Sequence, residues 1–106
     1  MNSTLKRLTK VWLTEGLEEA YYEFHCPGCD MLHMIQVMDT PQRKAWEWNG
    51  DEVNPTFAPS YVTWTSKERC HSFIRNGNIE FLSDCTHELA GKTVPLPYLD
   101  SEGEVV

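Results

Sequence analysis

The stretch CHSFIRNGNIEFLSDC, residues 70–85, decides the fold, because two strand-like patterns flank an Asn-Gly pair in it. Asn-Gly between alternating apolar residues is the strongest short-range signal for a β-hairpin. When the turn is centred on Asn76 and Gly77, Ile74 faces Ile79 on the opposite strand. The stretch therefore predicts an antiparallel strand pair with a fixed register.

This register assigns chemically different residues to the two faces of the hairpin, because successive side chains in a strand point to opposite sides. Cys70 and Cys85 are diagonal neighbours on one face. His71 lies on the other face and has Asp84 as its diagonal neighbour. We therefore expect two thiols on one side of the sheet and a histidine–carboxylate pair on the other.

The rest of the chain predicts short strands rather than long helices. Strand patterns occur at 20–26, 31–38, 46–48 and 60–64, while 5–13 fits a short helix or, as we expect, a strand. One helical turn is expected at 86–91, followed by an extended segment at 92–98. The fold class is thus mainly β, a small antiparallel sheet or barrel-like single domain. We expect an N-terminal segment at 1–19, a β domain at 20–98 and a flexible acidic tail at 99–106.

The composition is that of one globular domain. The chain has 106 residues, of which 41% are hydrophobic and 24% are charged. Its formal net charge of −7 disfavours nucleic acid as a partner. No apolar run approaches the ~20 residues of a membrane helix, and residues 1–10 lack the apolar stretch of a secretory signal. We therefore expect a cytoplasmic protein with reduced thiols and no membrane partner.

Four cysteines have a spacing that suits a zinc ion. Cys26 and Cys29 form the turn CPGC, which aims two thiolates at one tetrahedral ion. Cys70 and Cys85, at the foot of the hairpin, supply a second pair. Four ligands close the coordination shell, so the predicted cofactor is a structural Zn²⁺ that stabilises the β domain.

Other interpretations of the same residues remain open. His33 follows Cys29 by four residues and His87 follows Cys85 by two, so either histidine could replace Cys85 as the fourth ligand. The C-x-x-C turn is also compatible with a redox pair, although no βαβ pattern surrounds it. Four buried free cysteines are the simplest alternative.

The opposite face of the hairpin suggests catalysis. A carboxylate beside an imidazole fixes its tautomer and stabilises the imidazolium, as a catalytic base requires. Ser60 follows Pro59 at the start of a predicted strand, where a fixed backbone can present a hydroxyl. Ser60, His71 and Asp84 therefore form a candidate serine-type triad. The alternative is an exposed polar face with a simple His–Asp hydrogen bond.

An ordered set of motifs resembles a family of small phage and prophage proteins, a domain of unknown function often labelled ammonia monooxygenase. The motifs are CPGC with His33 after it (26–33), WEWNGD (46–51), NPTFAPS (54–60), CHSFIRNG (70–77) and FLSDCTHELAGKTVPLP (81–97). No membrane span or copper-type histidine cluster in the sequence supports that label.

The same motifs are more distantly similar to the zinc-containing serine peptidase of bacterial ubiquitination-like operons. The residues that carry this similarity are Cys26, Cys29, Pro59-Ser60, Cys70 and His71. Asp84 comes from the hairpin register and is not a matched position. The resemblance implies a zinc-stabilised serine-type hydrolase.

Two functions follow from these observations. The first is a phage- or prophage-encoded serine-type peptidase or isopeptidase that acts on a ubiquitin-like protein or its conjugates. The second is a non-enzymatic acidic binding module that inhibits a host defence protein, with Trp46, Trp48 and Trp64 as interface anchors. An enzyme needs Ser60 and His71 within hydrogen-bond reach, whereas an inhibitor does not.

Overall fold

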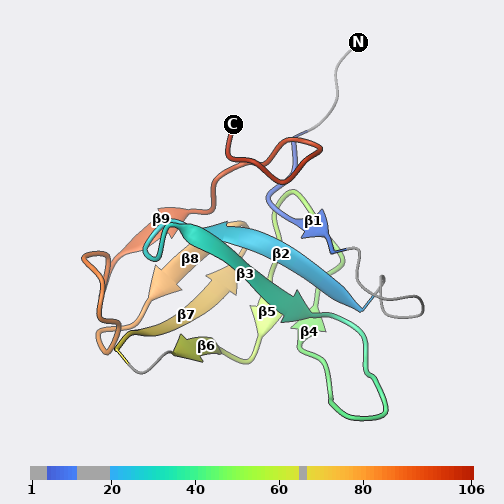
Figure 1. The fold of residues 1–106 in the computed structure, drawn as a ribbon, viewed down its shortest axis with the longest axis horizontal. Helices are drawn as coiled ribbons and strands as arrows, with labels where there is room; N and C mark the ends of the chain where they lie inside the picture. The colour runs from blue at the N-terminus through green and yellow to red at the C-terminus, as the bar shows by residue number, and fades with distance from the viewer. Residues whose placement is uncertain (1–4, 12–19, 65–66) are drawn as a thin grey trace.

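A computed structural model of the chain describes residues 5–11, 20–64 and 67–106, and these residues form short antiparallel sheets without a helix. The strands are β1 (Thr9–Lys10), β2 (Tyr21–Cys26), β3 (Met31–Gln36), β4 (Glu47–Trp48), β5 (Phe57–Ala58), β6 (Tyr61–Trp64), β7 (Arg69–Arg75), β8 (Asn78–Phe81) and β9 (Thr93–Pro95). They pair in the orders β1-β2-β3, β4-β5 and β6-β7-β8-β9 (Figure 1). No helix of these residues is long and apolar enough to cross a membrane.

The predicted hairpin is present as β7 and β8, and its register is confirmed. Ile74 pairs with Ile79 across the two strands. Asn76 and Gly77 have positive φ angles of 52° and 83°, as the central residues of a type I′ turn require. The expected extended segment supplies β9, where Pro95 lies on an edge strand and its missing N–H costs no central ladder bond.

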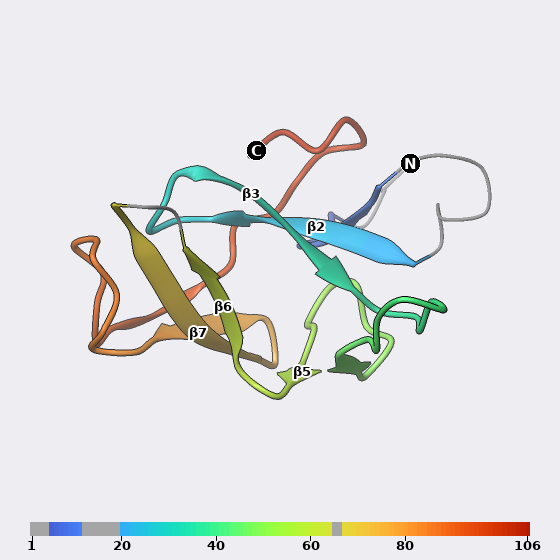
Figure 2. The same cartoon turned by 60° about the horizontal axis from the view of Figure 1, so that its bottom comes forward.

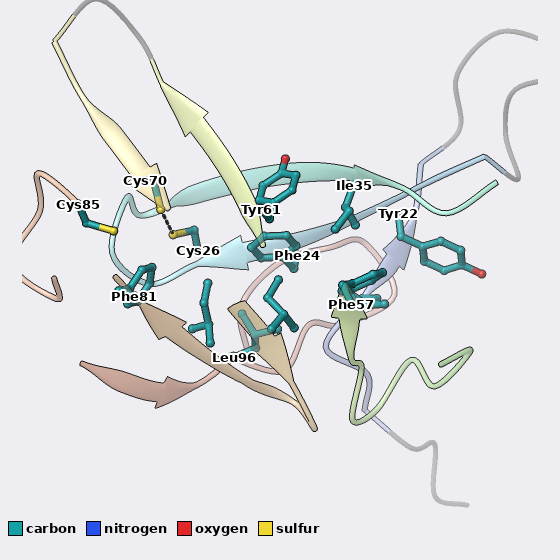
Figure 3. Packing of buried hydrophobic residues seen from close by; sticks show 13 residues of the cluster. Tyr22, Phe24, Cys26, Ile35, Phe57, Tyr61, Cys70, Phe81, Cys85 and Leu96 are labelled. Atoms are coloured by element: carbon teal, nitrogen blue, oxygen red, sulfur yellow. Dashed lines mark hydrogen bonds between the residues drawn. The ribbon is translucent and has the colours of Figure 1, made fainter. Parts of the chain in front are cut away.

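The core lies between the β1–β3 sheet and the four-stranded sheet, which are stacked in Figures 1 and 2. Alternate residues of β2 point inward, so that Tyr22, Phe24 and Cys26 are buried. Figure 3 shows Cys26 and Phe24 facing Phe81 and Leu96 from the opposite layer, while Tyr22 lies nearer Phe57. The mainly β class is thus confirmed, but the described sheets remain separate and do not close into the barrel that was one of the expected forms.

Both described ends of the chain contact this core. β1 pairs with β2, and Leu8 just before it is fully buried. Leu99 forms bridges with Lys6 and Val105. Residues 12 and 13 of the expected first strand lie outside the described residues.

The segment at 86–91, expected as a helical turn, consists of turns and bends instead. His87 accepts a backbone hydrogen bond from Ala90 and Leu89 accepts one from Lys92, each spanning three residues. The α-helical bond that spans four residues does not form there, because Gly91, with φ of 80°, leaves the helical region and bonds back to Phe81.

Candidate active site and metal cluster

A cluster of four potential ligand atoms lies on the inner side of the four-stranded sheet. Cys26, Cys29, Cys70 and His87 each offer one atom, and these atoms all lie within 4.8 Å of one another. Cys26 Sγ is 3.8 Å from Cys70 Sγ (dashed line in Figure 3), and Cys70 Sγ is 3.5 Å from His87 Nε2. Tetrahedral zinc with ordinary bond lengths requires about 3.8 Å between two sulfurs and about 3.6 Å between sulfur and nitrogen. Both separations therefore fit a zinc ion.

Three parts of the fold bring these ligands together. Cys26 ends β2, and a tight turn follows, in which the N–H of Asp30 donates to the carbonyl of Cys26 at 2.8 Å. Cys70 comes from β7 and His87 from the segment after β8. A Cβ atom on Gly28 would lie only 2.3 Å from His87 Cε1, so a glycine is needed for the imidazole to approach the turn.

The ionisation of the three thiols suits a cation. The hydrogen bond from Cys70 lowers the pKa of Cys26 to about 4, although burial opposes this shift. The same bond, and then burial, raise the pKa of Cys70 above its usual range. Burial, followed by the charge of Cys26, raises the pKa of Cys29 to about 11. Without a cation only one thiolate is favoured, whereas a bound divalent ion compensates the mutual repulsion of three thiolates.

The structure does not bring Cys85 into this cluster, although the hairpin register suggested it as the fourth ligand. Cys85 Sγ accepts a hydrogen bond from the N–H of His71 at 3.2 Å and donates one to its carbonyl at 3.1 Å. The last paired residue of β8 is Phe81, and the N–H of Cys85 bonds to Leu82 in a turn. The alternation of faces therefore ends before Cys85, and His87 stands in the cluster in its place.

The other alternative ligand, His33, lies close behind the cluster. It is buried, pairs with Phe24 across β2 and β3, and packs edge-on against the Phe24 ring. Its Nε2 has no hydrogen-bond partner among the described residues. His33 helps to lower the pKa of Cys26, but it is not one of the four clustered residues.

The outer side of the same sheet carries the second site. His71 Nε2 lies 3.0 Å from Ser60 Oγ, and His71 Nδ1 lies 3.2 Å from Asp84 Oδ2. Ser60 comes directly before β6, His71 lies in the middle of β7, and Asp84 follows β8. The structure therefore brings together all three residues of the candidate triad.

The pairing of β6 with β7 explains why Ser60 and His71 meet. Val62 of β6 pairs with His71 of β7, so the residue two positions before Val62 lies on the same face as the imidazole. Trp46 Nε1 donates to the carbonyl of Ser60 at 3.2 Å and fixes the backbone before the strand. The side chain of His71 is 23% exposed and that of Asp84 is 42% exposed, which leaves the site open to a substrate.

Arg69 is a member of this site that sequence reasoning missed. Its Nε lies 3.0 Å from Asp84 Oδ2, the oxygen that also contacts His71. Partial desolvation tends to raise the pKa of Asp84, but the bond from His71 and the charge of Arg69 outweigh it and lower this pKa. Asp84 is therefore ionised at neutral pH. The only signal in the sequence was that Arg69 and His71 are two apart and so share a face.

A hydroxyl, an imidazole and a carboxylate in this order of contacts form the constellation used by serine hydrolases. A family model described as bacterial ubiquitination-like system serine protease (BubE) matches residues 1–82. The chain belongs to this family. The matched region includes Ser60 and His71 and ends before Asp84 and His87. No curated protein and no solved structure matches the chain.

Proposed function

We propose that this chain is a serine-type peptidase or isopeptidase stabilised by a structural zinc ion. The observation that carries the proposal is the pair of contacts from His71 to Ser60 and to Asp84, at 3.0 Å and 3.2 Å. These distances are within hydrogen-bond reach, which a general base requires. Membership of a family named for a serine protease supports the same chemistry.

In the proposed reaction, Ser60 Oγ attacks the carbonyl carbon of the scissile amide while its proton passes to His71 Nε2. The resulting imidazolium is stabilised by ionised Asp84. His71 then gives the proton to the leaving nitrogen as the C–N bond breaks, and an acyl ester remains on Ser60. A water molecule, deprotonated by the same imidazole, hydrolyses the ester and restores the hydroxyl.

Zinc would be held by Cys26, Cys29, Cys70 and His87 and would crosslink β2, β7 and the segment after β8. Four protein ligands leave no open position for a substrate, so the ion contributes to folding rather than to the reaction. Cys70 lies on the buried face of β7, whereas His71 lies on the opposite, partly exposed face.

The proposed substrate is a ubiquitin-like protein, cut at its C-terminal tail or at its bond to another protein. The ubiquitination-like system in the family name supports this class of partner. Phage or prophage origin, which rests on the motif resemblance, and a cytoplasmic location in a bacterial host remain part of the proposal.

A non-enzymatic binding module is the second candidate, and one observation favours it. Trp64 is 68% exposed, which is unusual for so large an apolar side chain. Trp46 and Trp48, by contrast, pack against the core and are poor interface anchors. The acidic charge suits a basic partner, but an inhibitor has no need for the contacts of His71.

The decisive experiment is cleavage of a ubiquitin-like protein fused through its C-terminal tail to a fluorescent reporter. Ser60→Ala should abolish cleavage while the zinc content and melting temperature stay unchanged. Ser101→Ala, at an exposed position in the C-terminal segment, is the matched control and should cleave normally. If Ser60→Ala remains active, and chelation inhibits at once, the proposed serine mechanism is wrong.

A further inference from the structure

The outer edge of β6 begins directly beside the candidate nucleophile. β6 has a strand neighbour, β7, on one side only among the described residues (Figures 1 and 2). Ser60 immediately precedes its first residue, Tyr61. The edge therefore offers a surface along which a substrate chain could reach Ser60.

The hydrogen-bond pattern shows which backbone groups face this edge. The carbonyl of His71 accepts from the N–H of Leu82 at 2.9 Å, so the backbone of His71 points toward β8. In an antiparallel sheet this direction alternates along the strand. Cys70 and Ser72 therefore point toward β6, where they pair with Thr63 and Tyr61.

It follows that Val62 and Trp64 direct their N–H and C=O groups away from β7. Within the described part of the chain, no backbone group bonds to them on that side. The carbonyl of Ser60, two residues earlier, also points outward, but it already accepts a hydrogen bond from the indole N–H of Trp46. The available edge thus runs from Val62 to Trp64.

The side chains along this edge are apolar on the face that carries the triad. Ser60, Val62 and Trp64 alternate onto one face, which is also the face of His71. Trp64 is 68% exposed, and Val62 is half-buried. On the inner face, the hydroxyl of Tyr61 bonds to the carbonyl of Met34 and anchors β6 to the other layer.

We propose that the substrate is an extended polypeptide segment that adds to β6 as a further strand, pairing with the backbone of Val62 and Trp64. This inference rests on the proposed function and specifies its substrate class. Strand addition supplies affinity through main-chain bonds and selectivity through alternate side chains. A substrate side chain on the triad face meets Trp64, so an apolar residue is selected there. The bond to be cut must lie in a flexible tail or linker rather than in a folded surface.

The test compares Val62→Pro with Val62→Ala on a library of N-acetylated decapeptides. Proline removes only an outward N–H and is tolerated at an edge position, whereas alanine keeps this donor. Val62→Pro should lower kcat/KM for the cleaved peptides about tenfold, the effect of one lost main-chain bond. Val62→Ala should lower it about threefold or less. Labelling of Ser60 by a small alkyl fluorophosphonate, which has no chain to pair, should change less than twofold in both variants.

The best-cleaved peptide is then methylated at each backbone nitrogen in turn. Pairing predicts that kcat/KM falls at every second position and is unchanged between them. A uniform response, or a wild-type enzyme that is labelled at Ser60 but cleaves no peptide, overturns the inference alone. If the fluorophosphonate does not label wild-type Ser60, the proposed function fails first. If Val62→Pro also loses labelling, the variant has disturbed Ser60 itself, and the methylation pattern on the wild-type enzyme then decides whether the substrate pairs with β6.

Discussion

The two faces of β7 place adjacent residues in opposite environments. Cys70 is buried among three other potential ligands, while His71 is partly exposed and contacts a hydroxyl and a carboxylate. One peptide unit thus separates a site that suits a structural ion from a site that suits a reaction. The alternation of side chains in a strand makes this possible in so small a domain.

The difference also shows how the two sites depend on each other. A zinc ion bound by the buried cluster would crosslink strands from both layers, so its loss should weaken the whole fold. The residues of the exposed triad come from the position just before β6, from β7 and from the turn after β8. Their side chains are not part of the core. Loss of the cluster should therefore remove activity as well, whereas loss of a triad residue should leave the cluster intact.

The largest effect is expected when the buried face is broken. Cys70→Ser should lose the zinc and lower the melting temperature by about 20 °C or unfold the domain, because structural zinc contributes folding free energy directly. Metal analysis and thermal unfolding are the measurements. A strong chelator should have the same effect on the wild type. Full thermal stability of the metal-free protein would contradict a structural role.

Breaking the exposed face should produce the opposite combination. His71→Ala should reduce kcat/KM by about 10⁴-fold or more, as removal of a triad base does, but should retain one zinc per chain and the wild-type melting temperature. The reporter fusion gives the rate, and metal analysis gives the content. Zinc loss in this variant would show that the two faces are not independent.

The sequence predicted that β7 carries the thiol and the imidazole on opposite faces, and the Asn-Gly turn predicted the register of β7 with β8. Because both residues lie in one strand, Cys70 and His71 had to face opposite sides. The meeting of His71 with Asp84 was expected from the same register, and it is present although Asp84 lies in the turn after Phe81, the last paired residue of β8. The strand pattern itself accounts only for relations between residues that are paired in the ladder.

Past the last paired residue of β8, counting residues no longer predicts which face a side chain lies on. The pairing of β8 ends at Phe81, and a turn then rotates Cys85 toward the backbone of His71. Only the tertiary packing of the following loop brings His87 over Gly28, and no periodic pattern encodes that contact. Arg69 was missed for a related reason, since it acts through one bond to Asp84 and belongs to no motif. Trp46 was expected as an interface anchor, and its bond to the carbonyl of Ser60 was not foreseen.

A smaller effect is expected from a change beside the metal cluster that alters no ligand. Gly28→Ala places a Cβ atom 2.3 Å from the ring of His87, which must shift. We expect zinc affinity to fall about 10- to 100-fold, the range seen when a ligand's support is disturbed, with a lower melting temperature. Competition with a metal indicator measures the affinity.

The control for this variant is Pro27→Ala, which changes the same turn without adding an atom beside the imidazole. It should retain zinc affinity better than Gly28→Ala. Unchanged affinity in Gly28→Ala would mean that His87 is not a ligand, and Cys85 would then be tested next by Cys85→Ser.

The smallest effect is expected at Arg69, which we regard as a positioning residue because it acts on Asp84 and not on the substrate. The ion pair is largely exposed, so solvent screens it. Arg69→Gln should lower kcat/KM at neutral pH less than about fivefold. Its clearer signature is in the pH profile, measured with the reporter fusion.

The sign of this shift follows from the pKa of Asp84, which is held below its ordinary value by His71 and then Arg69, against partial desolvation. A carboxylate with a lowered pKa acts as an anion above that pKa, and its support of the imidazolium is lost as the pH falls through it. Removal of the guanidinium raises the pKa, so the acidic limb of activity should move to higher pH. Arg69→Lys keeps the charge and should move it less, and 1 M salt should shift the wild type toward Arg69→Gln. An unchanged acidic limb in Arg69→Gln would assign the orientation of Asp84 to His71 alone.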